Sequence, residues 1–403
     1  MKKLFFFLIF LLSALWGTAQ ERKIDSLKNV LAGSHEDTNK VNTLLAIAWY
    51  LKGNHPDEAK PYAARALALA DSLSFKRGVS SSCNTIGIIF YFQGNYDKAI
   101  QSHVRALAVR KEMGDKMGVA ASYNNIGLVY DDQGSYKDAI EYYLQSLKMY
   151  ESIKTKDGKQ GVAKVYNNLG VLYQEQGNYD KALECDENAL AMREELKDKE
   201  GVAMVLNNIG IVYRNQKKYD KTIEFYKKAL AIREELNDKQ GMASSYNNLG
   251  IVLKDKKDYR KSLEYHLKGL ALRQELGDRS GLAGSYINIG SLYACMGNYQ
   301  QSINFFNKGL MVSKEIGLKN GIKEGYIGLS IVYDSLRDYQ NAYEFHKQYS
   351  DVKDSLLNEQ SNKQITEMQT KYETEKKEQQ INLLNKDKEI QKAELKRQQI
   401  VIW

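Results

Sequence analysis

Apolar residues recur along most of this chain at the three- and four-residue spacing of an amphipathic α-helix. Residues 202–230 contain two such runs, the first formed by Val202, Val205, Leu206, Ile209, Val212 and Tyr213, the second by Tyr219, Ile223, Tyr226, Ala229 and Leu230. Polar turns such as Gln93-Gly94-Asn95 separate the two runs of a pair. Only two prolines occur in 403 residues, so few positions interrupt helices. The pattern predicts an all-α chain built from helix pairs.

Two series of glycines indicate that the helix pair is a repeated unit. The first series steps by 40, 43, 40, 40 and 40 residues and continues at Ser330: Gly87, Gly127, Gly170, Gly210, Gly250 and Gly290. The second series lies nine residues earlier: Gly78, Gly118, Gly161, Gly201, Gly241, Gly281 and Gly321. Three additional residues in the turn around 154–159 account for the longer step. We expect these glycines to let backbones approach where a Cβ would intrude.

An aspartate three residues before a second-series glycine marks the start of several units: Asp115, Asp198, Asp238 and Asp278. An Asp side chain at this place can accept hydrogen bonds from the free N–H groups of the first helical turn. We therefore expect each of these residues to cap the first helix of its unit.

The units resemble tetratricopeptide repeats, whose pattern places an aromatic residue, Leu and Gly in the first helix and Tyr, a small residue, an aromatic residue and Ala in the second. One unit carries the pattern as Tyr123, Ile126, Gly127, Tyr130, Gly134, Tyr136, Ala139 and Tyr143, and the next as Tyr166, Leu169, Gly170, Tyr173, Gly177, Tyr179, Ala182 and Ala189. The repeats have a 40-residue period and lack the Pro that usually closes a unit. In both features the chain resembles the long-repeat subgroup of the family, which is similar to the Pins-type scaffold proteins.

The resemblance implies a right-handed α-solenoid of tetratricopeptide helix pairs, followed by a long C-terminal helix or coiled coil. We expect a signal peptide at 1–19, an N-terminal capping helix at 20–40 and eight repeats at 41–350, the first of them degenerate. A charged long helix or coiled coil is expected at 351–399, and the start of a truncated membrane span at 400–403.

The N-terminal segment has the order of a secretory signal. Lys2 and Lys3 precede an apolar run over residues 4–16, and the small residues Gly17 and Ala19 stand where a signal peptidase cuts. We expect cleavage before Gln20, and an uncleaved anchor is the alternative.

The tail is charged and lacks glycine from Asp351 onward. Its apolar residues form a seven-residue seam with a shift of four: Ile365, Met368 and Tyr372, then Leu383, Ile390, Ala393 and Ile400. The seam predicts a homodimer through this helix, and a single helix lying back on the repeats is the alternative. Lys396 and Arg397 before the apolar residues 400–403 resemble the start of a membrane span, so a membrane is expected only if the chain continues beyond Trp403.

Asparagines stand two and three residues before the first-series glycines, at positions that the family geometry places on a concave groove lined by first helices. They are Asn124, Asn125, Asn167, Asn168, Asn207, Asn208, Asn247, Asn248 and Asn288. An amide side chain can donate to and accept from a peptide backbone, so a peptide or protein ligand is expected in this groove. Packing between repeats is the alternative role of each pair. If ligand contact is the role, replacing Asn208 and Asn248 by Ala should hardly change stability.

Other polar residues have structural interpretations. One position of the second helices is occupied by His103, His266 and His346 in some units and by Tyr143, Tyr226 and Phe306 in others, which indicates a packing role. Asp186 stands at the same position and has no explanation in the pattern.

The three cysteines, Cys83, Cys185 and Cys295, are far apart in the sequence, so we expect three free thiols and no zinc site. No cofactor is expected, and no metalloprotease, phosphate-loop or nucleophile-elbow motif is present, so an enzyme is not predicted.

Charge and composition narrow the class of partner. The 58 basic and 50 acidic residues are interspersed, without the concentrated basic face that nucleic acids require. The sequence therefore favours a non-catalytic peptide- or protein-binding domain. Its signal peptide, repeats and charged helix together resemble the periplasmic sensor region of Bacteroidetes-type sensor histidine kinases. A free-standing periplasmic scaffold protein is the alternative.

The predicted seam makes the tail testable. Removing the residues after about Asp354 should leave a folded, monomeric array, because each repeat contacts only its neighbours. The intact mature chain should dimerise in the micromolar range by sedimentation, and Leu383→Asp with Ile390→Asp should abolish the dimer by placing charges in the seam. A full chain that is monomeric at about 100 µM would contradict a dimer seam of this strength.

Overall fold

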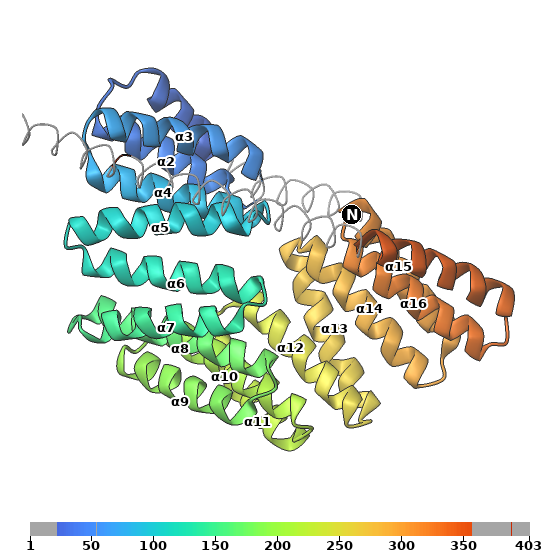
Figure 1. Ribbon diagram of the computed structural model, residues 1–403. Helices are drawn as coiled ribbons and strands as arrows, with labels where there is room; N and C mark the ends of the chain where they lie inside the picture. Colours follow the sequence, from blue (N-terminus) through green and yellow to red (C-terminus); the bar gives the residue numbers. More distant parts are fainter. Residues whose placement is uncertain (1–21, 54, 357–387, 389–403) are drawn as a thin grey trace, which may run out of the picture.

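The computed structural model describes residues 22–53, 55–356 and 388, and every regular element in this part of the chain is a helix (Figure 1). The helices are α2 (Thr38–Leu51), α3 (Pro56–Ser72), α4 (Lys76–Phe92), α5 (Tyr96–Glu112), α6 (Lys116–Asp132), α7 (Tyr136–Glu151), α8 (Lys156–Glu175), α9 (Tyr179–Glu195), α10 (Lys199–Asn215), α11 (Tyr219–Glu235), α12 (Lys239–Asp255), α13 (Tyr259–Leu276), α14 (Arg279–Cys295), α15 (Tyr299–Glu315) and α16 (Lys319–Ser335). Residues 22–32 and 339–356 are also helical. The predicted signal peptide, dimer seam and span start lie outside the described residues.

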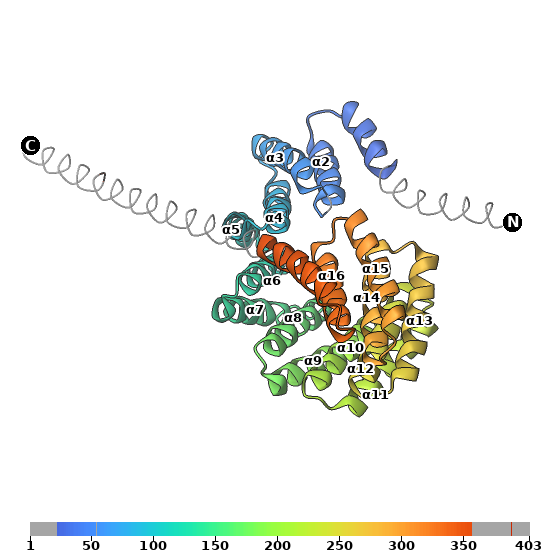
Figure 2. The same ribbon diagram turned by 90° about the vertical axis from the view of Figure 1, so that its right-hand side faces the viewer.

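The helices pack as consecutive pairs, which we call repeats 1 to 8. Repeat 1 is α2 and α3, repeat 4 is α8 and α9, repeat 7 is α14 and α15, and repeat 8 is α16 with the helix at 339–356. Each pair stacks on the next, so the described chain forms a curved stack (Figure 1 and, turned by 90°, Figure 2). The predicted fold class, an all-α solenoid of helix pairs, is confirmed.

First helices lie on the inside of the curve. Among the described elements, α6 approaches α8, α12 approaches α14 and α14 approaches α16, whereas second helices of neighbouring repeats do not approach one another to a comparable extent. A stack whose first helices are closer together than its second helices bends toward the first helices. Side chains on that face of the first helices therefore form the inner surface.

The first-series glycines make room for a side chain of the second helix rather than for backbone. A Cβ added at Gly127 would lie 2.8 Å from the Tyr143 ring, and one added at Gly210 would lie 2.4 Å from the Tyr226 ring. We call this second-helix position, sixteen residues after the glycine, the slot; its residues in repeats 2 to 7 are His103, Tyr143, Asp186, Tyr226, His266 and Phe306. All six slot side chains are buried. The expectation that the first-series glycines let two backbones approach is therefore wrong. In five of these six repeats the glycine instead makes room for the ring of a second-helix side chain.

The predicted aspartate caps are confirmed. The side chains of Asp115, Asp198, Asp238 and Asp278 each accept a hydrogen bond from the second-series glycine three residues later. At the joint before α12, the Arg233 guanidinium also donates from the preceding repeat to the Gly241 carbonyl (3.0 Å) and to Ser245 Oγ (2.6 Å). A Cβ at Gly241 would lie 2.8 Å from Arg233 Cδ and would also overlap Asp238 Oδ2, so this glycine leaves room for the arginine clamp and the cap.

The arginine clamp recurs at two other joints but not between repeats 3 and 4. Arg110 and Arg273 make the same two bonds before α6 and α14. Before α8 the corresponding residue is Tyr150. Its ring packs against Gly161, where an added Cβ would lie 2.3 Å from the ring. Thr155 caps α8. The expectation that the three additional residues lengthen the turn is corrected, because they mostly extend α8, which has 20 residues instead of 17. The joint before this longer helix is held by apolar packing instead of by a guanidinium.

The three cysteines are free, with Cys83 and Cys185 buried and Cys295 exposed. Burial is the main cause that raises the pKa of the Cys185 thiol to about 12, so it stays protonated at neutral pH. None of the described helices has the length and apolar character needed to cross a membrane.

Glycine replacements test the slot contact. Gly210→Ala should destabilise the protein by about 1–3 kcal/mol, because the new methyl group overlaps the buried Tyr226 ring. Gly284→Ala, in the interior of α14 with nothing within 4 Å of the added Cβ, should instead stabilise it by about 0.5–1 kcal/mol. Urea unfolding followed by circular dichroism measures both, and equal effects of the two variants would contradict the contact.

Candidate ligand-binding surface

The asparagine pairs of the first helices are joined into a ladder along the inner surface. In each step the second Asn of one repeat donates through Nδ2 to Oδ1 of the first Asn of the repeat before it. The bonds are Asn125 to Asn84 (2.9 Å), Asn168 to Asn124 (2.9 Å), Asn208 to Asn167 (2.9 Å), Asn248 to Asn207 (2.8 Å) and Asn288 to Asn247 (2.9 Å). The asparagine ladder thus joins repeats 2 to 7.

The ladder contains every asparagine predicted for the groove and one that was missed. Asn84 stands three residues before Gly87 and accepts from Asn125, but Thr85 follows it, so the paired pattern did not reveal it. Its place in the glycine series was the available signal. Asn124 is 1% exposed, and the other members are partly buried.

These bonds show that the pairs connect neighbouring repeats, the role weighed as the alternative to ligand contact. The expectation that Asn208→Ala and Asn248→Ala hardly change stability is therefore revised. Contact with a ligand stays a prediction, because the ladder uses only part of each amide. Both Nδ2 hydrogens of a first Asn remain, and so do the Oδ1 and one hydrogen of a second Asn. Asn124 is too deeply buried to offer its remaining atoms, whereas the partly buried members of the ladder keep side-chain surface that a ligand can reach.

Apolar side chains lie beside the ladder. The residue after each of the first five first-series glycines falls on the same helix face as the Asn pair, about one turn further along, and is partly buried: Ile88, Leu128, Val171, Ile211 and Ile251. One turn before the pairs, Lys164 and Met204 are exposed. The inner surface therefore combines a row of amides with a parallel apolar row.

Charge is distributed unevenly at the C-terminal ends of the first helices. In repeats 5 and 6, Arg214 Nε pairs with Asp255 Oδ2 (2.9 Å) and Lys254 Nζ donates to Ser291 Oγ (3.1 Å). In repeat 3, Asp131 Oδ2 accepts a hydrogen bond from the Tyr143 hydroxyl (3.3 Å). The pKa of Asp131 is raised to about 6, mainly by burial and to a smaller extent by the Glu175 and Asp132 carboxylates. The surface is thus acidic at repeats 3 and 4, whereas at repeats 5 and 6 Asp255 offsets the charge of Arg214 and Lys254 adds a cation.

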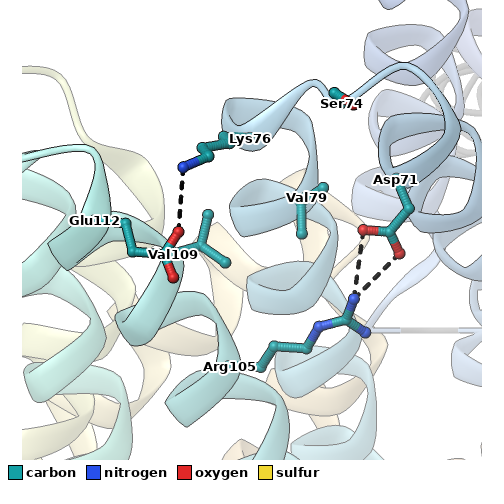
Figure 3. A pocket seen from close by; sticks show the side chains of 7 residues that line it. All are labelled: Asp71, Ser74, Lys76, Val79, Arg105, Val109 and Glu112. Carbon is teal, nitrogen blue, oxygen red and sulfur yellow. Dashed lines mark hydrogen bonds and ion pairs between the residues drawn. The ribbon is translucent and has the colours of Figure 1, made fainter.

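A surface hollow of about 300 Å³ between repeats 1 and 2 is a weaker candidate (Figure 3). Arg105 Nη2 pairs with Asp71 Oδ2 (3.1 Å) and Lys76 Nζ pairs with Glu112 Oε2 (3.2 Å) across it. Because its charged groups already pair with one another over the apolar Val79 and Val109, the hollow offers no free charge to a ligand. Elsewhere in the described part of the chain, His, Cys, Asp and Glu residues form no group that could hold a metal ion.

Comparisons with known proteins agree with this architecture. The sequence model of the family described as "Tetratricopeptide repeat" matches residues 80–152, 161–235 and 241–315, more than half of the chain. No curated protein sequence matches it.

Several solved structures are similar. Aspartyl phosphate phosphatase F from Bacillus subtilis has a TM-score of 0.59 at 18% identity over 83% of this chain and 88% of that chain. The apo quorum sensor NprR from B. thuringiensis has a TM-score of 0.57 at 17% identity over 84% and 94%. The Rap conjugation gene regulator of plasmid pLS20, solved with the Phr* peptide, has a TM-score of 0.54 at 15% identity over 84% and 96%. At these identities the similarity shows the fold only.

A double-mutant cycle tests the ladder. Asn208→Ala should lower the free energy of unfolding by about 1 kcal/mol, and Asn167→Ala by a similar amount, because each leaves its partner without an amide bond. The two losses should not add, and the coupling should be about 0.5–1.5 kcal/mol. Urea unfolding gives the four values. Full additivity would mean that the bond contributes nothing to stability.

Proposed function

Because the chain belongs to the tetratricopeptide repeat family, we propose that it is a non-catalytic domain that binds a peptide or protein segment along its inner surface. The observation that carries this proposal is the asparagine ladder, which spans six repeats and keeps unused donors and acceptors at each step.

An extended polypeptide suits such a surface. Its backbone presents one donor and one acceptor per residue, which matches amides that can both donate and accept. The apolar row from Ile88 to Ile251 would receive side chains that project toward it, while the amides hold the backbone. The solved structure of the pLS20 Rap regulator with the Phr* peptide is a precedent in that protein for peptide binding by a similar fold.

Charge would set the direction in which a ligand lies. The carboxylates of Asp131, Asp132 and Glu175 favour a positively charged end of the ligand at repeats 3 and 4, and Lys254 favours a negatively charged end near repeat 6.

Binding along the inner surface would also select one curvature of the stack, because a ligand that contacts several repeats favours the arrangement in which it can reach all of them.

The cellular role that we propose is the exported sensory or interaction region of a signalling receptor. Support comes from the sequence alone: the basic and apolar N-terminal segment resembles a signal peptide, and the tail seam suggests a homodimer that could transmit a change in curvature. A free-standing periplasmic scaffold protein is the second candidate, because the same repeats could equally well bind the proteins that a scaffold assembles. The encoded sequence beyond Trp403 distinguishes them, since a receptor requires a span of about twenty apolar residues.

Selection from a random peptide display library against the mature chain tests ligand binding. Enriched peptides should lose affinity by about tenfold when Lys164→Ala and Met204→Ala are combined, because both side chains are exposed beside the ladder. Leu144→Ala, which truncates an exposed apolar side chain of a second helix, is the matched control and should leave affinity unchanged. Failure to enrich any peptide, or equal losses in the control, would contradict groove binding.

A further inference from the structure

Asp186 occupies a position that every neighbouring repeat fills with an aromatic or imidazole ring. The slot contains Tyr143 in repeat 3, Tyr226 in repeat 5 and His266 in repeat 6, each over its first-series glycine. In repeat 4 the carboxylate of Asp186 faces Gly170, and a Cβ built on that glycine would lie 2.8 Å from Asp186 Oδ1. A short acidic side chain thus replaces a ring at the contact that closes the helix pair.

The surroundings of Asp186 do not compensate for its charge. The residue is 1% exposed, and its Oδ1 is buried without a hydrogen-bond partner. Burial alone raises the pKa of this carboxyl to about 7, with no contribution from a charged group on α8 or α10, the helices packed against α9. The ionisable groups on this stretch of α9 are Lys181, Glu184, Cys185 and Glu187, and none of them shifts the pKa of Asp186. An ionised carboxylate at this place is costly, whereas the protonated form is tolerated.

Repeat 4 also lacks the arginine clamp at both of its joints, whereas the clamp joins repeats 2 to 3, 5 to 6 and 6 to 7. Before α8 Tyr150 takes the place of the guanidinium, and α8 has 20 residues where α10 has 17. Before α10 Arg193 pairs with Asp198 Oδ2 (2.5 Å) instead of forming the clamp. The Asn168 to Asn124 bond and apolar packing remain. A solenoid is held together by successive neighbour contacts, so a weak unit in the middle separates the stack into two stable parts.

We propose that repeat 4 (residues 156–195) is a proton-controlled hinge of the solenoid, which opens readily when Asp186 is ionised and closes when Asp186 is protonated. This inference does not depend on the identity of a ligand. It assigns to the molecule a way to change curvature at one defined place.

The sign of the pH dependence follows from the direction of the pKa change. The pKa of Asp186 is raised in the closed repeat relative to the ordinary value of 3.8 in the opened chain, so closure is favoured by protonation. The stability that protonated Asp186 contributes to repeat 4 is fully present below pH 3.8 and is lost as the pH rises to about 7. His103 and His266 act oppositely in repeats 2 and 6, because burial lowers the pKa of each to about 4, and those repeats lose stability as the pH falls below 6.5.

Hydrogen exchange resolved by repeat tests the hinge. Protection factors of amides in residues 156–195, corrected for intrinsic exchange, should fall about tenfold between pH 6 and pH 8 in the intact chain. Amides of repeats 3 and 5, whose slots hold tyrosines, should change less than twofold. If repeat 4 is as protected as repeats 3 and 5 at pH 8, or shows no such fall, the proposal is wrong.

Three variants separate charge from shape. Asp186→Asn removes the charge without filling the slot and should abolish the fall between pH 6 and pH 8. Asp186→Tyr, which restores the residue found in repeats 3 and 5, should abolish it as well and raise the protection of repeat 4 further. Glu187→Gln neutralises the adjacent, exposed carboxylate on the same helix and should leave the pH dependence intact. A pH dependence that persists in Asp186→Asn would overturn the assignment even if Asp186→Tyr does not fold.

Discussion

Each helix pair of repeats 2 to 7 is closed by one side chain that lies on a glycine of the partner helix, and the rest of the architecture depends on this contact. The ring of Tyr226 over Gly210 is the clearest example, since even a methyl group would overlap it. The contact fixes the distance and rotation between the two helices of a repeat. Once these are fixed, every first helix presents the same face to its neighbour, and the polar residues on that face meet at regular intervals.

Much of the fold could be predicted from the sequence because its determinants recur at one period. The glycine series and the apolar spacing established the helix pairs, and local geometry was enough to predict the caps at Asp198 and Asp238. The role of the first-series glycines was predicted less well. A sequence shows that a side chain is missing at Gly127, but not that the space is taken by Tyr143, sixteen residues later.

The row of asparagines could be predicted from the sequence, but the bonds between them could not. Asn208 and Asn167 are 41 residues apart, and only the stacking of two repeats brings their amides to 2.9 Å. Spacing alone could not decide which Asn of a pair faces forward and which faces backward. Asp186 shows the opposite case, since the sequence revealed an irregularity whose meaning depends on burial. The amides of the inner surface therefore hold repeats together, and their remaining hydrogen-bonding capacity is what the proposed ligand would meet.

The asparagine ladder also bears on how such an array can change in length. Repeats 3 to 6 each carry a donor toward the preceding repeat and an acceptor toward the following one, so these units are interchangeable at their joints. Deleting repeat 5 as a 40-residue block would bring Asn248 to Asn167 and leave the series unbroken. Repeats 7 and 8 differ, because Ile287 and Gly328 stand where an acceptor and a donor would be needed. Gene duplication would therefore lengthen the protein from its middle, while its terminal units stay unique.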